Sequence, residues 1–201
     1  MSRNMTRNIS CLFAGLALVV WISACRVNVQ KGANGEDKNV QVDTPFGGVH
    51  VDTNSTTAAD LGLPVYPGAK VVKDDDNHKS ADVHLGFGEW QLRVRVVSYS
   101  SPDQQDKVEA YYKNALGRYG AVLTCQGNVA VGTPTQTPEG LTCSNDHKHT
   151  NVDVGSGLQL KAGSKSHQHI VGFDQPKDGQ TRFALIALDL PANMEGSASS
   201  D

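Results

Sequence analysis

The 201-residue sequence lacks most of the features that would assign it a chemistry. It contains no His-Glu-x-x-His or Cys-x-x-Cys metal motif, no Gly-x-Ser-x-Gly nucleophile elbow, and no glycine-rich phosphate or dinucleotide fingerprint. Acidic residues outnumber basic ones, 21 against 18, so the chain has no excess of the positive charge on which nucleic-acid binding depends. These absences argue against an enzyme and against a nucleic-acid-binding protein, and they give no reason to expect a cofactor.

The apolar run near the N-terminus is too short to span a membrane. It extends from Cys11 to Ile22, whereas a membrane-spanning helix needs about 20 apolar residues. A short basic stretch with Arg3 and Arg7, and without any acidic residue, precedes it. This combination is typical of a secretory signal, so residues 1–24 are predicted to direct export.

The run ends on Ile22, Ser23 and Ala24, and Cys25 follows at once. This pattern resembles the lipobox of bacterial lipoproteins, in which an aliphatic residue and two small residues precede an obligatory cysteine. The resemblance implies that the thiol of Cys25 is acylated, that a peptidase cuts just before it, and that Cys25 attaches the protein to a membrane. Several acyl chains bind a bilayer far more firmly than one, because each buried CH₂ adds about 0.8 kcal/mol. The alternative is an ordinary secreted protein whose signal ends near a cysteine.

The residue after Cys25 bears on which membrane is used. Lipoproteins kept in an inner membrane often have Asp at this position, and this chain has Arg26. We therefore expect an exported, lipid-anchored protein at the outer membrane that faces the periplasm. Without residues 1–24, which hold two arginines and no acid, 16 basic residues face 21 acidic ones and the net charge is −5.

Cysteine is scarce, and each of the four cysteines can be assigned a role. Cys11 belongs to the predicted signal and Cys25 to the predicted lipid attachment, which leaves Cys125 and Cys143. Two remaining cysteines in an exported protein predict a disulfide. The alternative, a redox-active pair of free thiols, is disfavoured by a spacing far from Cys-x-x-Cys.

The segments that follow Cys25 change character several times. Residues 25–38 are polar and predict a flexible tether. Residues 39–52 contain two alternating segments around a Pro-Phe-Gly-Gly turn and predict a small β-hairpin, whose docking on the rest of the protein is left open. Residues 53–61 are expected to be a linker, 62–190 the main domain, and 191–201 a disordered tail.

Alternating apolar and polar residues in the main domain predict antiparallel strands. Between them, a helix of four to five turns is predicted, with Ser101 as its N-cap and Pro102 at its first position. Its apolar stripe consists of Val108, Tyr111, Tyr112, Ala115, Leu116 and Tyr119. The fold class predicted is α+β: an antiparallel sheet with one long amphipathic helix packed on one face, in a single domain.

Several short segments carry a second resemblance: "DTPFGGVHVDT", "LPVYPGAK", "VEAYYKNALGRYG" and "SHQHIVGF". They resemble an uncharacterised family of exported bacterial proteins with an "LPVYPGA" opening. The resemblance covers about two-thirds of the chain. It implies a shared fold and similar boundaries, and no activity.

Two His-x-His pairs are the candidate metal ligands. His167 and His169 would project from one face of a strand, and His147 and His149 lie in a polar loop sequence. A polar strand face and a solvated loop are the favoured explanations of these histidines, so no metal site is predicted and metal binding is the alternative hypothesis.

Two other groups of side chains allow both a binding and a structural interpretation. Arg93 and Arg95 share a strand face and could hold an anion, but a neighbouring acid such as Asp82 or Glu89 is the favoured partner. The three helical tyrosines could line a groove, but aromatic residues at helical spacing favour a core position.

The function predicted is a lipid-anchored cell-envelope protein, non-enzymatic, that acts as a binding or structural module. One alternative is a periplasmic metal-binding lipoprotein that uses the His-x-His pairs. A second alternative is a hydrolase without a recognisable motif. The ligand or protein partner of such a module is not predicted by the sequence.

Overall fold

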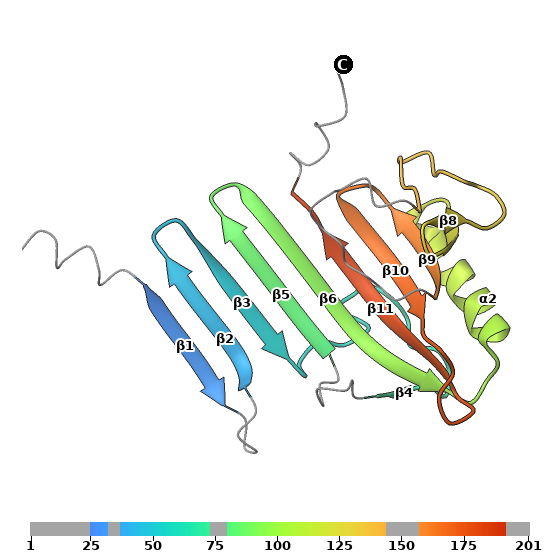
Figure 1. Ribbon diagram of the computed structural model, residues 1–201, viewed down its shortest axis with the longest axis horizontal. Coiled ribbons are helices and arrows are strands. Elements are labelled where there is room, and N and C mark those ends of the chain that lie inside the picture. The colour runs from blue at the N-terminus through green and yellow to red at the C-terminus, as the bar shows by residue number, and fades with distance from the viewer. Residues whose placement is uncertain (1–24, 32–36, 73–79, 144–156, 192–201) are drawn as a thin grey trace, which may run out of the picture.

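The protein is built around one large antiparallel sheet (Figure 1). The computed structural model describes residues 25–31, 37–72, 80–143 and 157–191, of which 50% are in strands and 11% in helices. The strands are β1 (Arg26–Lys31), β2 (Asp37–Thr44), β3 (Gly47–Thr53), β4 (Lys70–Val71), β5 (Ser80–Phe87), β6 (Trp90–Ser101), β7 (Leu123–Gln126), β8 (Val129–Ala130), β9 (Leu158–Gly163), β10 (His167–Phe173) and β11 (Thr181–Asp189). The helices are α2 (Gln105–Leu116) and the 3-10 helix η2 (Gly117–Tyr119).

The strands follow one another in the order β1-β2-β3-β5-β6-β11-β10-β9-β7-β8, and β4 pairs with β6 beside this path. Every pair is antiparallel. The chain runs from β1 to β6 through neighbouring strands, crosses over with α2 to the far edge, and returns to place β11 against β6. The last strand therefore joins an N-terminal and a C-terminal part into one sheet.

The predicted α+β class with one long amphipathic helix is wrong. The structure is mostly antiparallel sheet, and its helical segment spans 15 residues across α2 and η2. The start differs because Ser101 stays in β6, paired with Thr181, so that α2 begins only after Gln104. The Ser101 hydroxyl accepts a hydrogen bond from the backbone N–H of Asp103 and is not a helix cap. The Pro-containing turn thus ends a strand instead of opening a helix.

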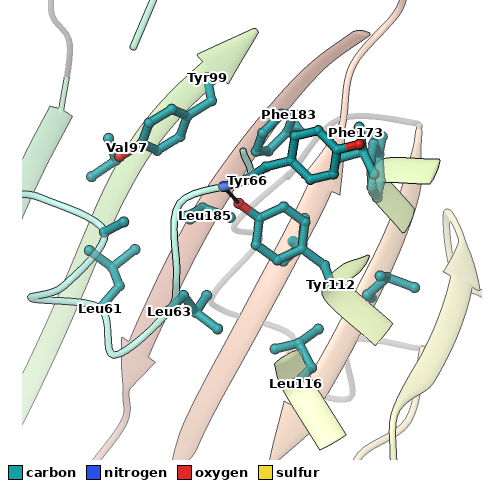
Figure 2. Packing of buried hydrophobic residues seen from close by; sticks show 14 of the residues in the cluster. Leu61, Leu63, Tyr66, Val97, Tyr99, Tyr112, Leu116, Phe173, Phe183 and Leu185 are labelled. Atoms are coloured by element: carbon teal, nitrogen blue, oxygen red, sulfur yellow. Dashed lines mark hydrogen bonds between the residues drawn. The ribbon is translucent and has the colours of Figure 1, made fainter. Parts of the chain in front are cut away.

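The predicted apolar stripe of the helix is confirmed. Val108, Tyr112 and Leu116 are fully buried, and Tyr111, Ala115 and Tyr119 pack at the margin of the same core. The sheet residues beneath them project from one face of four neighbouring strands, β6, β11, β10 and β9 (Figure 2). These residues are Val97, Tyr99, Phe183, Leu185, Ala187, Val171, Phe173, Leu160 and Ala162.

Three tyrosines of the helical segment hold the "LGLPVY" segment, residues 61–66, against it. Tyr112 donates to a backbone carbonyl of this segment at 3.2 Å and accepts the N–H of Tyr66 at 3.1 Å (Figure 2). Tyr111 and Tyr119 donate to two further carbonyls, at 3.2 and 2.5 Å. The three hydroxyls therefore satisfy backbone groups of a packed loop, and they do not line a groove.

The segment predicted to be a linker, residues 53–61, also belongs to the core. Ala58 and Leu61 are each 1% exposed, and a tight turn is closed by hydrogen bonds from Thr57 to the carboxylate of Asp60. The small and polar residues of "TNSTTAAD" suggested a linker because they show no periodicity. They form a compact turn, for which periodicity is not required.

Residues 26–31 and 37–38 of the predicted tether are instead part of the sheet. Arg26–Lys31 forms β1, and the last two residues of the expected tether begin β2, which extends over Asp37–Thr44. Val27 pairs with Val42 and Val29 with Val40, so the two valines of β1 continue the apolar face of the next strand. The expected hairpin at 39–52 is present as β2–β3, and β3 pairs with β5, which makes it a part of the main sheet.

The first five strands of the sheet have one apolar face, which we name the valine face. Two in-register rows of side chains form it: Val27, Val42, Val49, Leu85 and Leu92 in one row, and Val29, Val40, Val51, Val83 and Val94 in the other. None of these ten side chains is buried, and neither cluster of buried residues found in the described part of the chain includes one of them.

The valine face and the core under α2 lie on opposite sides of the sheet. In β6, Leu92 and Val94 belong to the valine face, whereas Val97 and Tyr99 belong to the core under the helix. The change occurs at the adjacent pair Val96 and Val97, where the alternation of apolar and polar residues gives way to two apolar residues in a row. β6 and β11 therefore both carry apolar residues on the two sides of the sheet, since Ile186 and Leu188 of β11 pair with Val96 and Val94.

Across the ranges that the structure describes, no helix has the length and apolar character needed to cross a membrane.

Candidate functional site

Cys25, the predicted lipid attachment, is exposed and carries a free thiol. It directly precedes β1, so no flexible segment separates it from the folded sheet. Arg26 pairs with Asp43, close to the β2–β3 turn, and this places Cys25 at the end of the sheet where that turn lies. The turn between β5 and β6 lies at the same end (Figure 1).

The predicted disulfide is confirmed, because Cys125 and Cys143 are bonded to each other. Both are buried, 0% and 3% exposed, in a small cluster with Leu123 and Leu141. The bond fixes the loop that follows β7 onto the sheet. A buried structural disulfide indicates an oxidising compartment, and hence an exported protein.

His167 and His169 do lie on one face of β10, but they occupy different environments. The ring of His169 stacks on Tyr119 with 3.6 Å between ring centroids, whereas His167 is exposed and its Nδ1 lies 3.1 Å from the hydroxyl of Ser166. The stacking holds the His169 ring against Tyr119 of η2. The pair that the sequence suggested as a chelate is thus divided between the core margin and the solvent.

Burial lowers the pKa of His169 below its ordinary value of 6.5, because the partly buried ring has lost water that would stabilise its charged form. Asp189 opposes this shift, whereas Arg95 and Arg118 add to it. Its Nδ1 is buried and has no hydrogen-bond partner among the residues that the structure describes. The side chain is therefore a neutral, stacked ring at neutral pH.

The other residues that the structure describes give no further support to metal binding. His147 and His149 lie outside the described residues. Within the described ranges, no group of three or more histidine, cysteine, aspartate or glutamate side chains could hold a metal ion.

Arg93 and Arg95 are both engaged by acids, as the favoured interpretation predicted for Arg93. The guanidinium of Arg93 forms a forked pair with the carboxylate of Asp82, at 2.9 and 2.5 Å. Arg95 donates to Asp189 at 3.0 Å and to the backbone carbonyl of Asp60. Nε of Arg95 is buried and has no hydrogen-bond partner among the described residues. Because an acid already pairs with each guanidinium, the arrangement disfavours an open anion site.

A polar row that the sequence analysis missed crosses the other side of the first five strands. Its members stand directly opposite one another on neighbouring strands: Asn28, Gln41, His50, His84 and Arg93. The rings of His50 and His84 have centroids 6.2 Å apart, and each ring has a partner, Asp43 at 3.3 Å and Gln91 at 2.6 Å respectively. The signal in the sequence is the repeated "VNV", "VQV", "VHV", "VHL" and "LRV", which becomes meaningful once the register is known.

A shallow hollow of about 100 Å³ lies over part of this polar side. It is far smaller than the roughly 300–1,000 Å³ of a typical small-molecule pocket. It is lined by Asn28, Gln30, Asn39, Val40, Gln41, His50, Val51 and Asp52. This lining offers no nucleophile paired with a base, so the hollow does not favour the hydrolase alternative.

Lys161 is a second residue that sequence reasoning did not single out. It is 6% exposed, and burial lowers the pKa of its amine. It lies in β9 on the side of the sheet opposite α2, across from Leu123 and Ile170. The hollow described above lies over β1–β3, at the other edge of the sheet, so the buried amine does not face it.

Comparison with known proteins finds no matching family model, no matching curated protein and no matching solved structure. The resemblance to exported proteins with an "LPVYPGA" opening, and the resemblance to the lipobox, therefore stay predictions.

Proposed function

We propose that this protein is a lipid-anchored module of the bacterial cell envelope, attached to the membrane through an acylated Cys25. The observation that supports this most directly is the position of Cys25: it follows the lipobox-like Ile22-Ser23-Ala24, is exposed, and stands immediately before the first strand. The disulfide between Cys125 and Cys143 fits the same exported route. Arg26 in the following position favours the outer membrane, with the domain facing the periplasm.

The module is non-enzymatic in this proposal, and it binds or supports a partner at the membrane surface. The side chains that were considered for ligand binding have structural partners instead: Arg93 pairs with Asp82, and the helical tyrosines hold a loop. The hollow over β1–β3 is small and lacks a nucleophile. A sheet that exposes one polar and one apolar face is better suited to surface contact than to enclosing a substrate.

Metabolic labelling with a clickable palmitate analogue tests the anchor. The full-length protein expressed in a bacterium should incorporate the label, and Cys25→Ser should not. Cys11→Ser is the matched control, because it changes the other predicted leader-region cysteine and should label normally. An unlabelled parent protein, or a Cys25→Ser variant that labels as well as the parent, would refute the proposal.

A further inference from the structure

The end of the sheet next to Cys25 has an unusual concentration of exposed aromatic side chains. Phe46, in the β2–β3 turn, is 81% exposed, and Phe87, at the end of β5, is 50% exposed. Trp90 begins β6 and its ring lies 5.9 Å from that of Phe87, between centroids. These residues come from two turns that lie side by side, since Gly48 of β3 pairs with Gly86 of β5.

The aromatic end continues directly into the valine face. Phe87 follows Leu85 in the alternation of β5, and Trp90 precedes Leu92 in that of β6, so both rings are on the side of the valine face. At the edge strand the same face ends in Val27 and Val29, which are 66% and 43% exposed. The described residues thus form one apolar surface that extends from the aromatic turns to the edge strand β1.

We infer that this apolar surface, formed by the valine face with Phe46, Phe87 and Trp90, lies against the lipid bilayer and orients the protein on it. The inference rests on the proposed function, because an acylated Cys25 would place the bilayer at this position. One peptide unit separates Cys25 from β1, and consecutive Cα atoms are about 3.8 Å apart. The acyl chains would therefore hold the corner of the sheet at the lipid surface, with no tether to lift it away.

The chemistry of the surface matches a lipid interface. Aromatic rings are enriched where a protein meets the headgroup region, and aliphatic side chains beside them gain free energy when they leave water. The ten side chains of the valine face are uncharged and have no hydrogen-bonding group. The backbone groups of β2, β3 and β5 pair with strands on both sides, as contact with an apolar environment requires, whereas β1 is an edge strand that pairs with β2 on one side. A strongly charged partner would find no complement on this surface.

Vesicle flotation of the exported form without its lipid tests the inference. The protein is residues 25–201 with Cys25→Ser, mixed with vesicles of phosphatidylethanolamine and phosphatidylglycerol. We expect it to float with the vesicles and the emission of Trp90 to move to shorter wavelength. Trp90 is a specific reporter because the other of the two tryptophans, Trp21, lies in the predicted signal.

Two matched pairs of variants separate the surface from general effects on the fold. Val27→Asp with Val29→Asp should lower the bound fraction several-fold, and Asn28→Asp with Gln30→Asp, on the other face of the same strand, should not. Phe46→Asp should lower it as well, whereas Val129→Asp should not, although Val129 is 67% exposed and lies at the opposite edge of the sheet. Each variant is first shown to keep the parent unfolding transition.

The inference is overturned if the unlipidated parent does not bind vesicles, or if the valine and phenylalanine variants bind as well as their controls. It is also overturned if sedimentation shows a dimer that Val27→Asp with Val29→Asp dissociates while vesicle binding is absent, because a second copy would then cover the surface. These outcomes are distinct from failure of the anchor. A labelled Cys25 with no vesicle binding refutes this inference alone, and vesicle binding with no labelling refutes the anchor alone.

Discussion

The two parts of the sheet have similar alternating strands, but their apolar residues have different surroundings. In β6, β11, β10 and β9, the apolar residues on one face are covered by α2 and by the loop at 61–66, and they form the main core. In β1, β2, β3 and β5, the apolar residues lie on the opposite face, which no buried cluster of the described residues includes. The comparison teaches that alternation specifies a sheet with two different sides, and that it does not specify whether the apolar side is covered.

The two parts of the sheet should therefore differ in local stability. A strand with few buried contacts opens at a lower free-energy cost than one in a packed core. We expect the backbone amides of β2 and β3 to exchange with solvent faster than those of β10 and β11, by on the order of a hundredfold or more. Hydrogen exchange followed by mass spectrometry of the mature protein measures this ratio. Equal protection in both parts would show that the valine face is covered in solution.

Deletion of a large side chain from the covered part should have the largest effect of any single substitution considered. Phe183 is 1% exposed and contacts Tyr99, Tyr112 and Phe173 through its ring. Phe183→Ala should lower the free energy of unfolding by about 3–5 kcal/mol, because it leaves a cavity in the core. Val51→Ala, in the open part, should cost less than about 1 kcal/mol. Urea denaturation of both variants gives the two values, and similar losses would contradict the distinction.

Removal of the disulfide should destabilise the covered part next. Cys125→Ala with Cys143→Ala frees a loop whose ends are 18 residues apart in sequence. A loop of this length predicts a loss of about 3 kcal/mol, mainly because the unfolded chain gains freedom. The same urea titration measures the loss for the double variant, with the oxidised parent as control. An unchanged midpoint would show that the cluster of Leu123 and Leu141 holds the loop without the bond.

Loss of a single hydroxyl from the loop–helix contact should have a smaller effect. Tyr112→Phe removes the donor to Pro64 and the acceptor for the N–H of Tyr66, and leaves a part-buried carbonyl and a buried N–H without this partner. We expect a loss of about 1–3 kcal/mol, since an unsatisfied buried group costs its desolvation. Tyr111→Phe, at the core margin, is the matched control and should cost less. Thermal unfolding ranks the two, and a reversed ranking would contradict this account of the contact.

The smallest effect that we predict is a loss of stability at acidic pH. Because burial lowers the pKa of His169 in the folded protein, the unfolded chain takes up a proton more readily as the pH falls below about 6.5. This contribution to stability is complete above that pH and is lost as the pH falls through the folded pKa. His169→Phe, which keeps a ring against Tyr119, should flatten the dependence of the melting temperature on pH between 7 and 5. An unchanged slope in the variant would show that other groups cause the acid sensitivity.

The elements that depend on neighbouring residues in the chain were predictable, and those that depend on distant ones were not. The apolar stripe of α2, the β2–β3 hairpin and the disulfide were predicted from spacing and count. The prediction of a long helix that begins at Ser101 was wrong because Ser101 pairs with Thr181, a partner 80 residues away along the chain. The prediction of a flexible tether was wrong because Val27 and Val29 belong to a strand that pairs with β2.

The residues of the candidate site also differ in whether the sequence could predict them. Cys25 and its surroundings could be identified by motif, because the lipobox is a local pattern that precedes folding. The row through His50 and His84, and the apolar surface near Phe46 and Phe87, could not be identified, because they are formed by the register of five strands. No property of a single strand indicates which residues will face one another across the sheet.

The amino-acid sequence alone settles the alternation of each strand, the stripe of the helix and the choice of Cys125 and Cys143 as partners, because these follow from side-chain chemistry and short-range geometry. The tertiary structure decides that the sheet is continuous from β1 to β8, that the side of β6 facing α2 becomes apolar at Val97, and that Cys25 stands against a folded edge. These features require strands far apart in the chain to pair in one register, and the free energy of that pairing belongs to the assembled sheet and to no single segment.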